Sequence, residues 1–289
     1  MNSRARAWPY LTPLLVLLAL WVYGPAGVSV ILSFLDWNLT TPPSGFVGVE
    51  NYATLRRHPE FIRSVGQTLL YALALLPFST LVPLVLAVML WLRPGRASDI
   101  YRALLFLPVV LAPVAVAVAW RFLLNPLQGL VNEALQAIGL PAVNWLGDPA
   151  TALLVIVVIT AAKVVAFNLL LYGATLSAIG HRIVEAARLE GATGIDIARS
   201  IVLPQVRRPT IVLALLSIVL AGQWTFANIS VLTQGGPDGV TDNVYYRIYT
   251  LGFTFFDIGE ASAAAVLLLA GFAVVAGAWS AVRRFVRAS

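Results

Sequence analysis

Long apolar runs separated by short polar stretches are the dominant pattern along this chain. Six runs reach the length of about 20 mostly apolar residues that a helix needs to cross a bilayer. Several contain proline, which membrane helices tolerate because neighbouring helices satisfy the freed backbone groups. The pattern predicts an all-α integral membrane protein with six transmembrane helices. These cover approximately residues 10–35, 68–92, 103–124, 150–176, 210–233 and 261–282.

The first run follows two arginines, Arg4 and Arg6, as the apolar core of a signal peptide would. It is longer than the signal core of about 7–15 residues, and no clear small-x-small cleavage site follows it. We therefore expect this run to remain in the protein as the first transmembrane helix.

Positive charges alternate in density between successive polar segments. If the N-terminus is cytoplasmic, the inside segments hold thirteen arginines and the outside segments hold five. Lys and Arg concentrate in cytoplasmic loops, so this split predicts that both termini face the cytoplasm. The preference for Arg over Lys and the abundance of Ala suggest a bacterial genome, and therefore a bacterial plasma membrane. The net charge of +6 is mostly this topology signal, and no soluble basic face suggests a nucleic-acid partner.

Composition narrows the chemistry further. Hydrophobic residues make up 60% of the 289 positions and charged residues 11%, whereas soluble domains carry about 25% charged residues. The chain has no cysteine, which excludes disulfides and thiolate metal sites. Its two histidines, His58 and His181, both fall in polar segments, so we expect no metal site within the helices.

The first outside segment, residues 36–67, becomes amphipathic around Tyr52, Leu55, Phe61 and Ile62. That pattern predicts a short helix lying on the membrane surface. We accordingly divide the chain into an N-terminal part that ends with this segment and a core of five helices. The expected boundaries are 1–66 and 67–289.

The longest inside segment, residues 177–209, carries the densest pattern of charges. Residues 183–190 predict a short helix that ends at Gly191 in a left-handed conformation. A second short helix is expected over residues 195–201, stopping before Pro204. Two short helices joined at a glycine would form a compact protrusion suited to a partner's groove.

The spacing in this segment, E-A-A-x-x-x-G-x₉-I-x-L-P, resembles the cytoplasmic signature of ABC importer permeases. The positions that match are Glu185, Ala186, Ala187, Gly191, Ile201, Leu203 and Pro204. Other stretches resemble the first of the two unlike permeases in the sugar and glycerol-phosphate branch. They are residues 35–38, 46–52, 101–108, 232–237 with Thr241, 248–249 and 259–263. His181 and Glu190 depart from the family pattern, which leaves the docking contacts less defined.

The resemblance implies a membrane subunit that binds no cofactor and works with other proteins. Its expected partners are a second permease, two copies of a cytoplasmic ATPase that uses ATP and Mg, and an external solute-binding protein. Lys163 is the only lysine, and it lies outside any G-x-x-x-x-G-K-[ST] loop, so this chain is not the ATPase. Glu185, Ala186 and Gly191 are the main candidates for passing the ATPase motion on. A merely structural cap is the alternative for this segment.

Polar residues within the runs are candidates for the substrate pathway. Lys163 would meet an anionic or hydroxyl-rich solute, or else pair with a backbone carbonyl or another helix. Asn168 lies just beyond it. Trp224 and Asn228 are four residues apart, with Gln223 beside them. Trp224 would stack on a sugar ring while the amides of Gln223 and Asn228 bond to its hydroxyl groups. Alternatively, the amides join neighbouring helices.

The turn Gly235, Gly236 and Pro237 opens the third outside loop. Taken together, the residues and the resemblance predict the permease of an ATP-driven importer for a sugar or sugar-like solute. A glycerol-phosphate or glycerophosphodiester importer is the alternative. A self-sufficient secondary transporter is disfavoured because acidic residues are missing from the apolar runs. A membrane enzyme is disfavoured because no nucleophile–base pair stands out.

Overall fold

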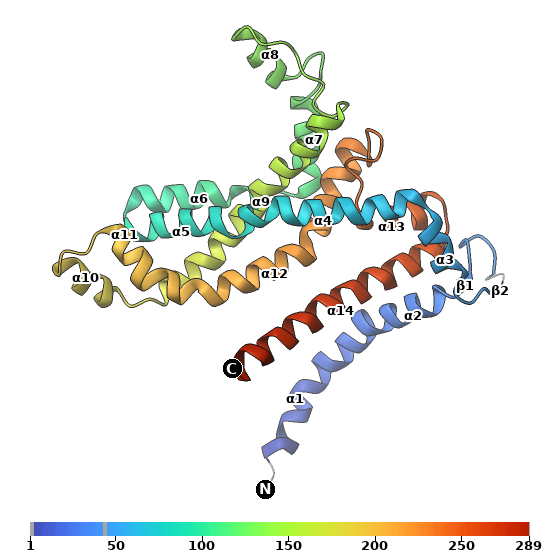
Figure 1. Ribbon diagram of the computed structural model, residues 1–289, viewed down its shortest axis with the longest axis horizontal. Coiled ribbons are helices and arrows are strands. Elements are labelled where there is room, and N and C mark those ends of the chain that lie inside the picture. Colours follow the sequence, from blue (N-terminus) through green and yellow to red (C-terminus); the bar gives the residue numbers. More distant parts are fainter. Residues whose placement is uncertain (1–2, 43–44, 289) are drawn as a thin grey trace. The chain divides into compact units, whose positions relative to one another are not determined.

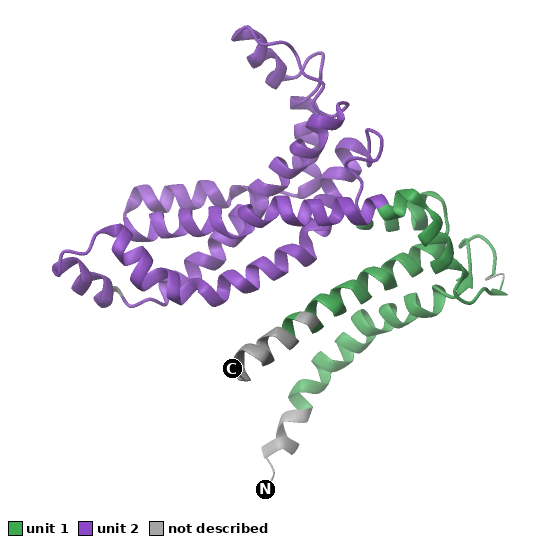
Figure 2. Ribbon diagram, viewed as in Figure 1, with its two compact units in different colours: residues 1–62, 244–289 green, residues 63–243 purple. Residues whose placement is uncertain are grey.

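The computed structural model describes residues 3–42 and 45–288. Contacts group the chain into two compact units (Figure 2). Unit 1 comprises residues 1–62 and 244–289, and unit 2 comprises residues 63–243. The described elements are helices apart from one two-stranded sheet (Figure 1). Residues 244–289, which the sequence assigned to the five-helix core, group here with the N-terminal part.

Unit 1 is built around the last helix, which contacts α2 and α3. The two short strands pair antiparallel, with Leu35 opposite Phe46. The elements are α1 (Ser3–Leu18), the π-helical turn η1 (Ala19–Tyr23), α2 (Gly24–Leu32), β1 (Leu35–Asp36), β2 (Gly45–Phe46), α3 (Glu50–Arg57), α13 (Val244–Tyr249), η4 (Thr250–Thr254) and α14 (Ile258–Ala288).

The amphipathic helix expected on the membrane surface is α3, and its apolar side packs inside unit 1. Leu55 is 1% exposed and belongs to a buried cluster with Phe61, Val244, Ala263 and Ala264. The apolar side of α3 therefore packs within the protein, and the position of this helix on the membrane surface stays a prediction. The small side chains of Ala263 and Ala264 leave room on α14 for the larger apolar side chains.

Asn51 joins three segments at the start of α3. Its Nδ2 donates to the carbonyl oxygens of Ser33, at 2.9 Å, and Leu35, at 3.0 Å. Gly259 lies beside this contact, where an added Cβ would stand 2.4 Å from the Leu35 oxygen and 2.7 Å from Asn51 Nδ2. Several residues that carry the family resemblance therefore serve to hold unit 1 together.

Unit 2 is arranged around α9, which contacts α5, α6 and α12. Its first helix, α4, begins in unit 1 and continues into unit 2. The elements are α4 (Pro59–Ser79), α5 (Leu81–Leu92), α6 (Arg96–Val110), α7 (Pro113–Leu123), α8 (Leu130–Ala137), α9 (Pro149–Ser177), α10 (His181–Leu189), α11 (Gly194–Ile197), η2 (Ala198–Val202), α12 (Leu203–Asn228) and η3 (Ile229–Thr233).

Five stretches are long and apolar enough to cross a membrane. They are Pro9–Leu32, Pro59–Leu92, Pro149–Ser177, Gly194–Thr233 and Ile258–Gly277. The expected third helix over 103–124 is wrong as one continuous helix, because α6 and α7 meet at an angle of 95°. Leu111 and Ala112 are extended immediately before Pro113, as the ring of a proline favours. Counting this bent pair as one span gives six.

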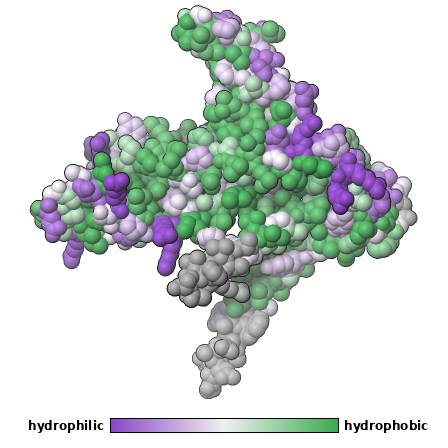
Figure 3. All heavy atoms as spheres, viewed as in Figure 1, coloured by the Kyte–Doolittle hydropathy of each residue, from purple (hydrophilic) through white to green (hydrophobic). Residues whose placement is uncertain are grey.

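The surface of unit 2 is divided into apolar and polar regions. On the face shown in Figure 3, apolar side chains cover most of the long helices. Polar side chains gather at the end that carries α10 and α11. Polar side chains also gather on the opposite side of this view, and an apolar middle between polar regions is typical of a bundle that spans a bilayer.

Candidate functional site

The 177–209 segment folds as two helical pieces around a glycine turn. The expected first helix is confirmed as α10, and Gly191 has a φ of +88°, in the left-handed region that favours glycine. Thr193 then caps α11, with its side chain and that of Asp196 bonding to each other's backbone N–H groups.

The expected stop before Pro204 is wrong, because the helix continues through it. The π-helical turn η2 connects α11 to α12, and the backbone N–H of Leu203 donates to the carbonyl of Ala198. A π turn is wider than an α turn and accommodates the proline ring at the start of α12. α11, η2, α12 and η3 therefore form one run of 40 helical residues, Gly194–Thr233.

α10 has one face turned to the protein and one turned outward. Val184 is buried, and Ala187 is half-buried against the same apolar cluster. Glu185 and Ala186 are exposed, and Leu189 is 90% exposed. The outward face thus combines a carboxylate, a small residue and an unburied leucine, which suits contact with another protein.

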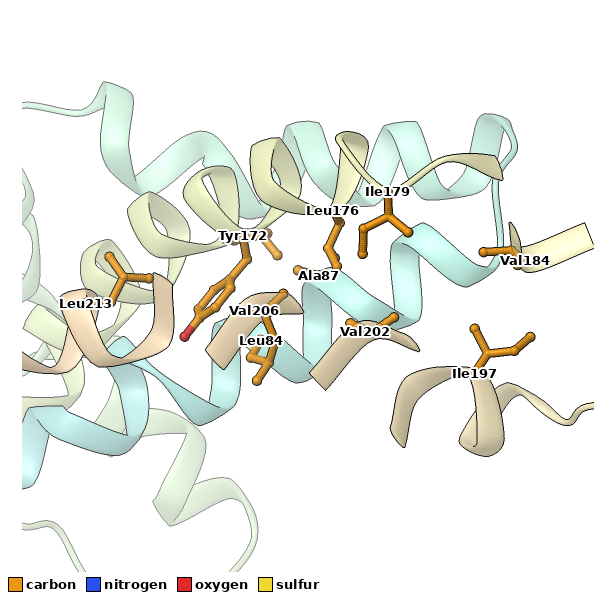
Figure 4. Close-up of a cluster of buried hydrophobic side chains, with 11 residues drawn as sticks. Leu84, Ala87, Tyr172, Leu176, Ile179, Val184, Ile197, Val202, Val206 and Leu213 are labelled. Atoms are coloured by element: carbon orange, nitrogen blue, oxygen red, sulfur yellow. The ribbon is translucent and has the colours of Figure 1, made fainter. Parts of the chain in front are cut away.

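A buried apolar cluster, which we call the α10 cluster, joins Val184 of α10 to side chains of neighbouring helices (Figure 4). It draws side chains from α5, α9, α10, α11 and α12, so the segment is joined to three long helices. Ile201 and Ala187 pack against it, whereas Leu203 is 45% exposed. Its members are Leu84, Ala87, Leu169, Tyr172, Leu176, Ile179, Val184, Ile197, Val202, Val206 and Leu213.

Arg188 provides a second attachment of α10. Its Nη2 donates to the carbonyl oxygen of Leu92, the last residue of α5, at 2.9 Å. The last carbonyls of a helix have no intrahelical donor, so this hydrogen bond satisfies one of them. Among the described ion pairs none joins Arg188 to Glu185, its neighbour on the helix.

Lys163 lies in α9 and is half-buried. Within residues 3–42 and 45–288, the structure gives its ammonium group neither an ion pair nor a hydrogen bond. An ionised group at membrane depth is costly without a partner. Lys163 therefore stays a candidate for the substrate pathway.

Asn168 hydrogen-bonds to backbone at the interruption between α4 and α5. Pro83 has no N–H to donate to the carbonyl of Ser79 four residues earlier, and the helix is interrupted at Thr80, between α4 and α5. Asn168 Nδ2 donates to this Ser79 oxygen at 2.8 Å, and Asn168 is 2% exposed. The structure thus uses this amide to satisfy buried backbone.

The expected group in α12 is divided between two environments. Asn228 is 6% exposed, and its Nδ2 donates to Thr160 Oγ1 of α9 at 2.8 Å. Gln223 is exposed and Trp224 half-buried. The amide of Asn228 therefore links two helices, as the alternative interpretation held.

The glycine turn at residues 235–237 is held by Thr241, one of the residues that carry the family resemblance, and by Tyr71 and Arg63 of α4, which sequence reasoning did not single out. Thr241 Oγ1 donates to the carbonyl of Gly236 at 2.6 Å, and Tyr71 of α4 donates to the Thr241 carbonyl at 3.0 Å. Arg63 donates to the carbonyl of Asp238 at 2.6 Å. Gly235 has a φ of +83°, and the Gly236–Pro237 peptide is cis.

Comparisons with known proteins identify the family. Residues 44–284 match the family described as the binding-protein-dependent transport system inner membrane component. The chain belongs to this family. The probable ABC transporter permease protein YurN of Bacillus subtilis is 34% identical over 93% of each chain. The sn-glycerol-3-phosphate transport system permease protein UgpA of Pectobacterium atrosepticum is 31% identical, over 89% of this chain and 86% of UgpA.

The fold agrees with a solved importer. A bacterial ABC transporter involved in the import of the acidic polysaccharide alginate contains a chain that superposes with a TM-score of 0.82 at 24% identity. The match covers 97% of this chain and 96% of that one.

Membership of this family fixes the general role. The chain is a non-catalytic permease subunit of an ABC importer in the inner membrane, and ATP hydrolysis belongs to a separate subunit. It works with a solute-binding protein and with other subunits of the importer. The alternatives of a self-sufficient secondary transporter and a membrane enzyme are thereby excluded.

Proposed function

We propose that this permease and a second permease together form the pathway for a sugar or sugar-like solute, delivered by an external binding protein. Two copies of a cytoplasmic ATPase, which uses ATP and Mg, would drive the movement. The observation that carries this mechanism is the outward face of α10, fixed on the α10 cluster. Both termini of the chain would lie in the cytoplasm.

The coupling step follows from the way α10 is attached. Glu185, Ala186 and Leu189 face outward, where a groove of the ATPase would receive them. Their helix is held through the α10 cluster and through the Arg188 contact with α5. A displacement of α10 would therefore move α5, α9 and α12 as a rigid body.

The positions in the signature divide between docking and support. Ala187 and Ile201 pack inward, so their contribution would be to the stiffness of the segment. Gly191 would set the angle between α10 and α11 through its left-handed conformation. Leu203 and Pro204, both exposed at the start of α12, would continue the docking face.

The sugar assignment is supported by Trp224 and Gln223 in α12. An aromatic ring stacks on the apolar face of a sugar, while an amide bonds to its hydroxyl groups. Asn168 and Asn228 are engaged in buried hydrogen bonds, so their share in the pathway would be to fix the helices that line it. The outer turn at residues 235–237 would face the binding protein.

A glycerol-phosphate solute is the second candidate. It is favoured by Lys163, whose ammonium group has no partner among the described residues, and by the UgpA relatives, which are named for sn-glycerol-3-phosphate transport. An acidic saccharide would satisfy the same charge, and the alginate importer of similar fold carries one.

Uptake into proteoliposomes that contain the assembled importer, its binding protein and ATP distinguishes these candidates. We expect unlabelled sugars to compete with the transported solute, and Trp224→Ala to weaken uptake more than Trp224→Phe does. Competition by glycerol 3-phosphate but by no sugar would contradict the sugar assignment. Loss of uptake in Lys163→Gln with retention in Lys163→Arg would then support the anionic solute.

A further inference from the structure

A groove of about 650 Å³ lies between the end of α5 and the segment that runs from α10 through α11 into η2. It is formed within unit 2 and is separate from the outward face of α10. Three arginines line it, each from a different element: Arg93 at the end of α5, Arg188 in α10 and Arg199 in η2.

Three arginines make the lining of the groove positively charged. None of its lining residues is acidic, and among the described residues none of the three arginines forms an ion pair. The nearby carboxylate of Asp196 attracts Arg199 but accepts its hydrogen bonds from Thr193. Arginines held near one another repel, and an anion between them relieves this repulsion.

Apolar side chains adjoin the arginines in the same groove. Met89 is 55% exposed and Ile195 is 71% exposed, and Leu92, the last residue of α5, also lines the groove. A small soluble anion would leave these side chains in water. A ligand with a charged head and an apolar tail would cover both parts of the groove.

We propose that this groove binds the phosphate headgroup of an anionic phospholipid from the inner leaflet. Arg93, Arg188 and Arg199 would hold the phosphate, while an acyl chain would lie along Met89 and Ile195. Basic pockets between helices at the cytoplasmic side of a membrane bind such headgroups. The bound lipid would join the end of α5 to η2 and so stiffen the segment beside α10. The site rests on the proposed cytoplasmic position of this end.

Native mass spectrometry of the importer complex, released from nanodiscs, tests the site. The nanodiscs contain phosphatidylglycerol and phosphatidylcholine with the same acyl chains. We expect the complex to retain phosphatidylglycerol preferentially, and the double variant Arg93→Gln/Arg199→Gln to lose roughly tenfold or more of it. Arg208→Gln, which removes an exposed charge of the same segment outside the groove, should retain the lipid.

Three results would overturn the proposal. The first is an equal loss of lipid in Arg208→Gln, which would indicate a general charge effect. The second is retention only when the ATPase has been removed, which would indicate that this protein covers the groove. The third is displacement of all retained lipid by millimolar inorganic phosphate, which would indicate a site for a soluble anion.

A photoactivatable phosphatidylglycerol provides a measurement that does not depend on the folding of the variants. In the unaltered complex we expect its crosslinks on residues 89–93 and 193–199. Crosslinks confined to other segments would contradict the site. Neither lipid measurement requires solute uptake. An error in the proposed solute would therefore leave lipid retention and crosslinking unchanged, whereas an error in this site would change them.

Discussion

The side-chain amide of Asn168 donates a hydrogen bond to the backbone carbonyl of Ser79, which lacks its usual helical donor because Pro83 has no N–H. The contact joins residues 89 positions apart, from Asn168 Nδ2 to the Ser79 oxygen. An unsatisfied carbonyl in the interior of a helical bundle costs about 1–3 kcal/mol. The amide therefore belongs to the packing of α9 against the junction of α4 and α5.

Replacing this amide should destabilise the protein without touching its surface. We expect Asn168→Leu to lower the free energy of unfolding by about 1–3 kcal/mol, because Ser79 loses its donor. Thermal unfolding in detergent measures the effect, with the exposed Gln223→Leu as the matched control. An unchanged unfolding temperature for Asn168→Leu would contradict the assigned hydrogen bond.

Gly191 offers a test of conformation at a single residue. Its left-handed φ of +88° is strained for residues with a Cβ, although no atom lies within 4 Å of the position a Cβ would take. We expect Gly191→Val to reduce ATP-driven uptake strongly and Gly191→Asn to retain most of it, because asparagine tolerates this region. Equal uptake by both variants in proteoliposomes would show that the conformation is unimportant.

The sequence identified polar residues in apolar helices but could not assign their partners. A lone asparagine in a run looks the same whether it faces a pathway or a neighbouring helix. Thr160 and Ser79, which bind Asn228 and Asn168, are set by the packing of helices distant in sequence. Their roles therefore required the fold.

The segment from α11 to η3 acts as a single long element. It begins beside the α10 turn and continues without a break through Pro204 to Thr233. The left-handed Gly191 was predictable, because glycine at a helix end has a local cause. The continuation through Pro204 and the bend before Pro113 were not, because whether a proline breaks a helix depends on neighbouring turns and helices.

Ile197 tests whether this element must be held firmly to transmit motion. It is 1% exposed within the α10 cluster, and truncating a buried isoleucine costs about 2–5 kcal/mol. We expect Ile197→Ala to lower the unfolding temperature and the solute transported per ATP hydrolysed. Ile195→Ala, which truncates an isoleucine that is 71% exposed, is the stability control. If Ile197→Ala lowers the unfolding temperature but leaves the solute transported per ATP unchanged, coupling does not depend on the stiffness of this element.

At the scale of the whole molecule, the account depends on which ends of the helices face the cytoplasm. The chain has no cysteine, so single cysteines introduce a label without background. We expect Gln136→Cys in α8 to react with a membrane-impermeant maleimide in intact spheroplasts. Arg182→Cys in α10 should react only after permeabilisation. The opposite pattern would reverse the proposed orientation.

The most direct test of the account measures ATP hydrolysis and solute uptake together in proteoliposomes of the assembled importer. We expect Glu185→Lys, on the outward face of α10, to lower uptake at least about tenfold while the subunits still copurify, because a reversed charge disfavours docking. Glu190→Lys makes the same change at another exposed position at the end of α10 and should retain more uptake. Unchanged uptake by Glu185→Lys, or uptake by the unaltered complex without ATP, would contradict the central claim.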